Sequence, residues 1–154
     1  MKQGKNSDDD MDSVITKSFI ITGAYYGDKC FPGLNDMFHE ACRHPKAYNQ
    51  MKQQFQMLTV NAIRCQLRGF RAQRLIRLNM TFGEPRKGNK RDYDNISSAA
   101  RKIINDALVK TGTIKDDSPK YLWDGNNTFK YTDVPYIRVE IEEVATPELP
   151  NFSW

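Results

Sequence analysis

Two aspartates separated by one residue stand just before the most regular helical pattern of the chain. Asp92 and Asp94 precede that pattern, and a second acidic pair, Asp116 and Asp117, follows its end. Carboxylate oxygens suit Mg²⁺ or Mn²⁺, and magnesium needs only a few because it keeps several waters. Such ions activate water and neutralise charge in phosphodiester hydrolysis. We therefore predict that Asp92, Asp94 and Asp117 are metal ligands and catalytic residues, and that the intervening helix brings Asp117 back to the first pair.

The same acids also fit a structural role. Asp94 is a favourable N-cap residue, and Asp92 beside a helix N-terminus interacts well with the helix dipole, effects of about 0.5–2 kcal/mol. The pair at 116–117 is followed by Ser118 and Pro119, which is ordinary turn composition. The residue pattern alone leaves both interpretations open.

Basic residues dominate the stretch that leads into this cluster. Between positions 64 and 91, Glu84 is the single acid against these basic residues: Arg64, Arg68, Arg71, Arg74, Arg77, Arg86, Lys87, Lys90 and Arg91. A positive field of this kind attracts phosphates, although a solvated surface has the same composition. Arg91 would clamp a phosphate bidentately or pair with Asp92 or Asp94. Lys102, two turns into the helix, offers a point charge to a phosphate.

Composition bounds the class of protein. The chain has 154 residues, a net charge of +4, 27% charged and 39% hydrophobic residues, which indicates one soluble globular domain. We expect a cytoplasmic protein without membrane association, because there is no secretory signal and no apolar run of about 20 residues. Three scattered cysteines indicate no disulfide framework, and with only two histidines the sequence predicts a metal held by oxygen ligands and not a zinc site. Without a GxGxxG or Walker A loop, we expect no organic cofactor.

Hydrophobic periodicity predicts an α/β (α+β) fold, with a mixed sheet of about four strands and two long helices. The folded domain is expected at 15–145, between an acidic disordered tail at 1–14 and an irregular tail at 146–154. We expect strands at 18–22, 74–82, 129–131 and 136–142, the last two as an antiparallel pair. We expect a short helix at about 35–43, ended by Pro45, and longer helices at 48–65 and 96–111, with a loop at 84–89.

Two helix faces are expected to enter the core, and one polar stripe is expected to follow the candidate site. In the helix at 48–65 the core face comprises Tyr48, Met51, Phe55, Leu58, Ala62 and Cys65. In the helix at 96–111 it comprises Ile96, Ala99, Ala100, Ile103 and Ala107. A neighbouring polar stripe runs through Asn95, Ser98, Lys102 and Asp106. Gly112 is expected to end this helix as its C′ residue.

The motifs together resemble the RusA-like family of Holliday junction resolvases, in the branch seen in phages and prophages of bacteria. The resemblance rests on the 91–95 run, on 106–108 (Asp-Ala-Leu) and on 116–117, in that order and at fitting spacing. It extends from about Phe19 to Glu142. It implies a RusA-like fold and a homodimeric, Mg²⁺-dependent endonuclease that nicks four-way DNA junctions symmetrically during DNA recombination and repair.

The resemblance also implies roles for particular residues. The family's catalytic carboxylates match Asp92, Asp94 and Asp117, and a family lysine on the following helix matches Lys102. That helix is about one turn longer here than in the shorter bacterial members. Because one full turn preserves the side on which a residue lies, Lys102 faces the same way as the family lysine. The basic residue before the first aspartate matches Arg91. We expect the following residues to contact DNA: Arg86, Lys87, Lys90, Arg91 and Asn95.

Two other functions stay open at this point. One is a non-catalytic protein that binds branched DNA, in which the aspartates are caps and turn residues. The other is a nuclease that prefers flaps or replication forks. Cleavage in Mg²⁺ distinguishes a nuclease from a non-catalytic binding protein. Relative rates on a panel of branched substrates distinguish a flap or fork nuclease from a junction resolvase.

Overall fold

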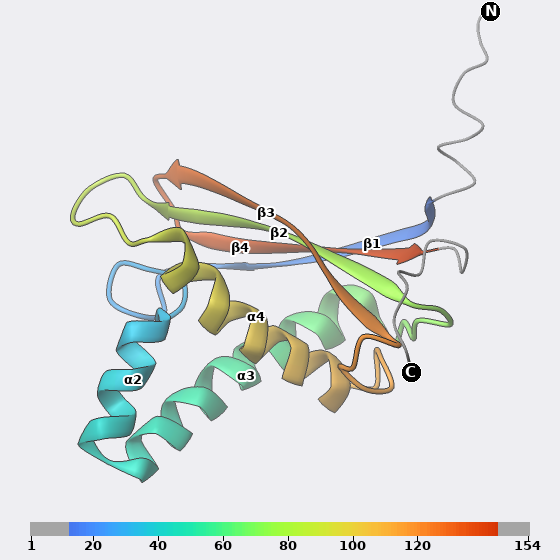
Figure 1. Ribbon diagram of the computed structural model, residues 1–154. Helices are drawn as coiled ribbons and strands as arrows, with labels where there is room; N and C mark the ends of the chain where they lie inside the picture. Colours follow the sequence, from blue (N-terminus) through green and yellow to red (C-terminus); the bar gives the residue numbers. More distant parts are fainter. Residues whose placement is uncertain (1–12, 145–154) are drawn as a thin grey trace, which may run out of the picture.

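The computed structural model describes residues 13–144, with side chains from Thr16 onward (Figure 1). One four-stranded sheet lies over three helices, which all cover the same face of the sheet. The elements, in chain order, are β1 (Ser13–Thr22), α2 (Leu34–Arg43), α3 (Pro45–Leu67), β2 (Ile76–Pro85), α4 (Tyr93–Lys110), β3 (Leu122–Thr132) and β4 (Tyr136–Val144). The expected α+β fold with a mixed sheet and two long helices is confirmed. The expectations for 1–12 and 146–154 lie outside the described residues.

The strand order is β1-β4-β2-β3. β4 is antiparallel to both of its neighbours, β1 and β2, whereas β3 is parallel to β2. The prediction of an antiparallel pair at 129–131 and 136–142 is therefore wrong, because β2 lies between these two strands. The short connection at 133–135 crosses the end of β2, where Thr132 pairs with Pro85 and Tyr136 pairs with Gly83. Gly83 permits this crossing, since a side chain there would collide with the Tyr136 ring.

One face of β2 is apolar from Ile76 to Phe82. The alternating residues Ile76, Leu78, Met80 and Phe82 are each 0–1% exposed, as the period-two pattern predicted. On the helix side, the expected α4 face is confirmed, with Ile96, Ala99, Ala100, Ile103 and Ala107 all buried. The alanines on this face allow the helix to lie close to the sheet. α4 is therefore fixed along its length, and its two ends are held in defined positions.

The predicted core face of α3 is partly wrong. Cys65 is exposed, and the buried residues are Phe55, Thr59, Val60, Ile63 and Leu67. The face is rotated because α3 packs against β1 as well as α2 and α4. The short helix α2 ends at Arg43 before Pro45, as predicted, and Pro45 then opens α3, where its missing N–H carries no cost.

All four strands extend farther than predicted, and the predicted end of α4 is confirmed. β3 begins at Leu122 and not at 129, and β4 continues to Val144 and not only to 142. β1 begins at Ser13, so residues 13 and 14 belong to the sheet and not to an N-terminal tail. β2 continues to Pro85, which places Glu84 in a strand with 7% exposure instead of in a loop. Gly112 follows the C-cap of α4 with φ of +76°.

Candidate functional site

Asp92 and Asp94 lie at the start of α4, beside the start of α2. They help to line a hollow of about 500 Å³, to which Leu34 and Asn35 of α2 also contribute. Asp92 occupies the N-cap position with φ −66° and ψ 147°, but its side chain makes no capping hydrogen bond. Asp94 lies in the first helical turn, so the interpretation of Asp94 as the N-cap is wrong. Both carboxylates are exposed.

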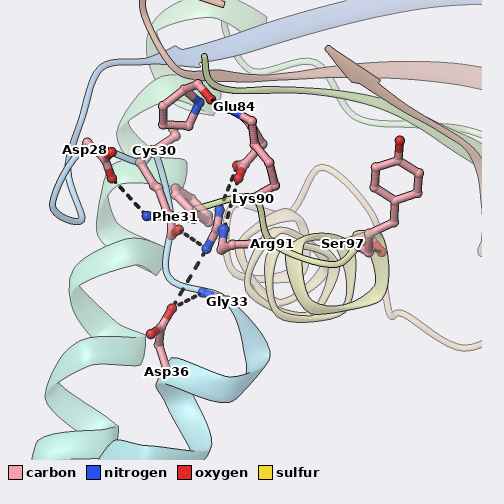
Figure 2. Close-up of polar contacts among 12 residues, drawn as sticks. Asp28, Cys30, Phe31, Gly33, Asp36, Glu84, Lys90, Arg91 and Ser97 are labelled. Carbon is pink, nitrogen blue, oxygen red and sulfur yellow. Dashed lines mark hydrogen bonds and ion pairs between the residues drawn. The ribbon is translucent and has the colours of Figure 1, made fainter. Parts of the chain in front are cut away.

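Arg91 anchors the chain immediately before these aspartates (Figure 2). Its Nε and Nη2 donate to the two carboxylate oxygens of Glu84 at 3.0 and 2.7 Å. Its Nη1 donates to the carbonyl of Phe31 at 3.1 Å and lies 3.8 Å from Asp36. The side chains of Arg91 and Glu84 are only 10% and 9% exposed. The prediction that Arg91 pairs with Asp92 or Asp94 is therefore wrong, and its guanidinium is bound to the protein instead of being open to a phosphate.

Asn95 anchors the chain immediately after the aspartates. Its Oδ1 accepts a hydrogen bond from the backbone N–H of Asn35 at 2.8 Å, which ties the start of α4 to the start of α2. Gly33 is required for this approach, because a Cβ there would stand 2.6 Å from Asn95 Oδ1. Asn95 was expected to contact DNA, but its amide oxygen is used within the protein. The residues on both sides of the Asp-Tyr-Asp run are thus fixed, while the two aspartates face solvent.

The described carboxylates fall into two groups. All Asp and Glu side chains in the described part of the chain except three accept a hydrogen bond or form an ion pair. These partnered acids are Asp28, Asp36, Glu40, Glu84, Asp106, Asp116, Asp124, Asp133, Glu140, Glu142 and Glu143. The three without a partner among residues 13–144 are Asp92, Asp94 and Asp117. Asp116 illustrates the contrast, since its Oδ1 accepts from Ser118 N at 2.8 Å to form the turn, whereas its neighbour Asp117 is uncommitted.

Asp117 lies at the opposite end of α4 from the other two. It lines a separate hollow of about 450 Å³ together with Asp106 and Lys110 of the last helical turns. An α-helix rises 1.5 Å per residue, so Asp94 and Asp106 are about 18 Å apart along the axis. Metal–oxygen bonds are only about 2.0–2.6 Å long. The expectation that the helix returns Asp117 to Asp92 and Asp94 is wrong, because α4 carries the chain away. The chain returns only along β3, after Asp117, where Phe129 reaches Tyr93.

No group of three or more His, Cys, Asp or Glu side chains within residues 13–144 is arranged to hold a metal ion in a single chain. Lys102 is exposed in the middle of α4, about 12 Å along the axis from Asp94, and it lines neither hollow. The structure thus brings together Asp92 and Asp94, but it brings neither Asp117 nor Lys102 to them.

The basic loop before Arg91 remains at the surface. Lys87 is exposed, and Arg86 pairs with Asp133 at 2.9 Å. The ammonium of Lys90 lies 4.6 Å from the centroid of the Tyr131 ring and also donates to the carbonyls of Pro85 and Arg86. Exposed cations and an exposed aromatic ring therefore lie together on this loop and the adjoining strand β3.

Two residues were not singled out in the sequence analysis, Tyr93 beside the aspartates and Arg101 in the middle of α4. Tyr93, between the two aspartates, is 59% exposed, and its ring stacks on Phe129 at a centroid distance of 4.2 Å. Arg101 lies on the buried face of α4 and donates to the Leu78 carbonyl and to Asn127 Oδ1. Burial lowers the pKa of Arg101, and nearby Asp124 opposes that shift. Arg101 interrupts an otherwise apolar helix face, which is a signal in the sequence, whereas Tyr93 precedes the apolar repeat that begins at Ile96.

The sequence matches none of the protein-family models and none of the curated proteins with which it was compared. Across residues 13–144, no helix has both the length and the apolar character required to cross a membrane. The fold and the site together are those of a small α+β domain that presents two unpaired carboxylates at one end of α4 and a third at the other.

Proposed function

We propose that this protein is a metal-dependent endonuclease that nicks four-way DNA junctions during recombination and repair. The observation that carries the proposal is that Asp92, Asp94 and Asp117 are the only described carboxylates without a partner in the protein. A carboxylate that caps a helix or closes a turn accepts a hydrogen bond from a backbone N–H, as Asp116 does from Ser118, and these three accept none among residues 13–144. The resemblance of the motifs to RusA-like resolvases suggests the substrate class.

The donor set at Asp92 and Asp94 fits a hard divalent ion. Both side chains offer oxygen, both are exposed, and neighbouring residues hold the backbone on either side. Two carboxylates with bound waters suit Mg²⁺ or Mn²⁺. Such an ion, when bound, supplies activated water and charge neutralisation for phosphodiester hydrolysis. In the chain itself, Lys87 and Lys90 attract DNA phosphates, and Arg91 and Asn95 act as positioning residues that fix the start of α4.

We further propose that the third carboxylate comes from a second copy of the chain. In an isologous dimer each contact occurs twice, related by a twofold axis. If the two α4 helices run antiparallel across that axis, Asp117 of the partner subunit comes to Asp92 and Asp94, and the reverse holds at the second site. A dimer of this kind has two equivalent sites, which suits the two equivalent strands cut in a four-way junction.

The test is nicking of a synthetic four-way junction in Mg²⁺, in Mn²⁺ and in EDTA. We expect paired, symmetric nicks in the wild type and none in EDTA. Asp94→Asn should lower the rate about 100-fold or more, since even residues that only support metal ligands cost 10- to 100-fold. Asp116→Asn is the matched control, because asparagine keeps the acceptor oxygen of the turn at Ser118.

Full nicking by Asp94→Asn would refute the proposal. Tight junction binding with no cleavage in either metal would favour a non-catalytic DNA-binding protein. Faster cleavage of flaps or forks in the same panel would keep the nuclease and change its substrate.

A further inference from the structure

A hollow lined by cations lies at the C-terminal end of α4, away from Asp92 and Asp94. Its volume is about 670 Å³, and its walls come from three segments, at 71–75, 109–115 and 120–121. Four basic side chains line it, and no carboxylate does: Arg71, Arg74, Lys115 and Lys120. It adjoins the hollow of Asp117, because Val109 and Lys115 line both. The cations of this region are therefore gathered by the tertiary structure from positions distant in sequence.

The arrangement of this cationic pocket depends on the end of α4. Arg71 Nη1 donates to the carbonyl of Gly112 at 2.8 Å. Gly112 has φ of +76°, and a Cβ at this position would occupy the place of the Arg71 guanidinium. The turn that ends α4 thus also holds an arginine at the pocket wall.

The remaining cations have no ion-pair partner among residues 13–144. Arg74, Lys115 and Lys120 form no ion pair with any side chain of the described residues. Like charges held close together repel one another, and an anion placed among them relieves that repulsion. Arginine and lysine together are the residues that proteins use to bind phosphate.

We propose that this pocket binds backbone phosphates of a DNA strand that runs past Asp117. The inference rests on the proposed function for its substrate class, and it adds a contact surface distinct from the 86–90 loop. A strand held here is guided toward the carboxylate at the same end of α4. Arg71 and Arg74 thereby bind a part of the DNA different from the part that the 86–90 loop binds near Asp92.

The experiment measures junction binding by fluorescence anisotropy in EDTA, over a range of salt concentrations, so that cleavage plays no part. Arg74→Gln and Lys120→Gln are compared with Lys46→Gln, an exposed lysine at the start of α3 that loses the same charge. Each pocket variant should reduce the magnitude of the negative slope of the logarithm of the association constant against log salt by about 0.9, and should weaken binding about 3- to 5-fold. Wild-type slopes in both pocket variants, or losses equal to that of Lys46→Gln, would overturn the inference.

A second arm identifies the source of the phosphate. A single-stranded oligonucleotide should shift the backbone amide signals of 71–75 and 112–115 in NMR spectra, and inorganic phosphate at the same concentration should shift them less. Shifts caused by inorganic phosphate alone would overturn the assignment to DNA. If no metal supports cleavage but the pocket variants still lose slope, the nuclease proposal fails while this inference holds.

Discussion

Combining two inactive variants in one dimer tests whether the active site is shared between subunits. Asp94→Asn and Asp117→Asn should each be inactive as homodimers. The two positions cannot act on one ion within a chain, because α4 separates Asp94 from the Asp117 end by about 18 Å. In a dimer that contains one subunit of each kind, one shared site has both substitutions and the other has none.

The expected magnitude follows from this symmetry. The mixed dimer has one intact site out of two, so its rate of first nicking should be about half that of the wild type. Paired nicking should be lost, because the second site in the same dimer is inactive. Sites confined to single subunits would each contain one substitution, and the mixed dimer would then be inactive.

The assay uses co-expressed subunits with two different affinity tags and a supercoiled plasmid that extrudes a cruciform. A single nick gives the open circle, whereas two paired nicks give the linear form. A dimer that combines Asp92→Asn with Asp94→Asn is the matched control, since both substitutions affect the same half of each shared site and no intact site remains. An inactive mixed dimer of Asp94→Asn and Asp117→Asn would refute the shared site, and an active Asp117→Asn homodimer would remove Asp117 from it.

Three further predictions test the surroundings of the site. Arg91→Met leaves the Glu84 carboxylate buried without its partner, so urea denaturation should show a loss of about 3–5 kcal/mol, which a second substitution, Glu84→Met, should largely restore. A single variant as stable as the wild type would contradict the buried pair. Tyr93→Leu should weaken junction binding about 5-fold or more, if the exposed ring stacks on a DNA base, and should cost about 1 kcal/mol of stability through the lost stack on Phe129; unchanged affinity would show that the ring serves only the fold. Burial raises the pKa of the Cys30 thiol to about 12, so at pH 8 it should stay protonated and react with a disulfide reagent only on unfolding, while the two exposed cysteines react at once. Three fast thiols in the native protein would be inconsistent with this packing.

Local periodicity was sufficient to predict much of the framework of the site. The alternation along β2 and the apolar face of α4 are properties of consecutive residues, and both are confirmed by burial. The same local pattern located Asp92 and Asp94 at the start of α4, because the change from loop to helical period marks that boundary. Gly112 at the end of the helix was predicted for the same reason, since a C′ residue with positive φ favours glycine.

Contacts between distant segments were decided only by the tertiary structure. Arg91 lies beside two aspartates in sequence, yet it pairs with Glu84, because β2 extends far enough to place that carboxylate in the protein interior beside it. β3 and β4 are consecutive in the chain, yet β2 separates them. Asp117 is separated from Asp94 because a straight helix keeps its two ends apart, and spacing alone did not reveal this. The sequence thus determines which residues carry charge and which face α4 buries. The packing of distant segments determines which face α3 buries, which charges are neutralised and which remain free to bind a ligand.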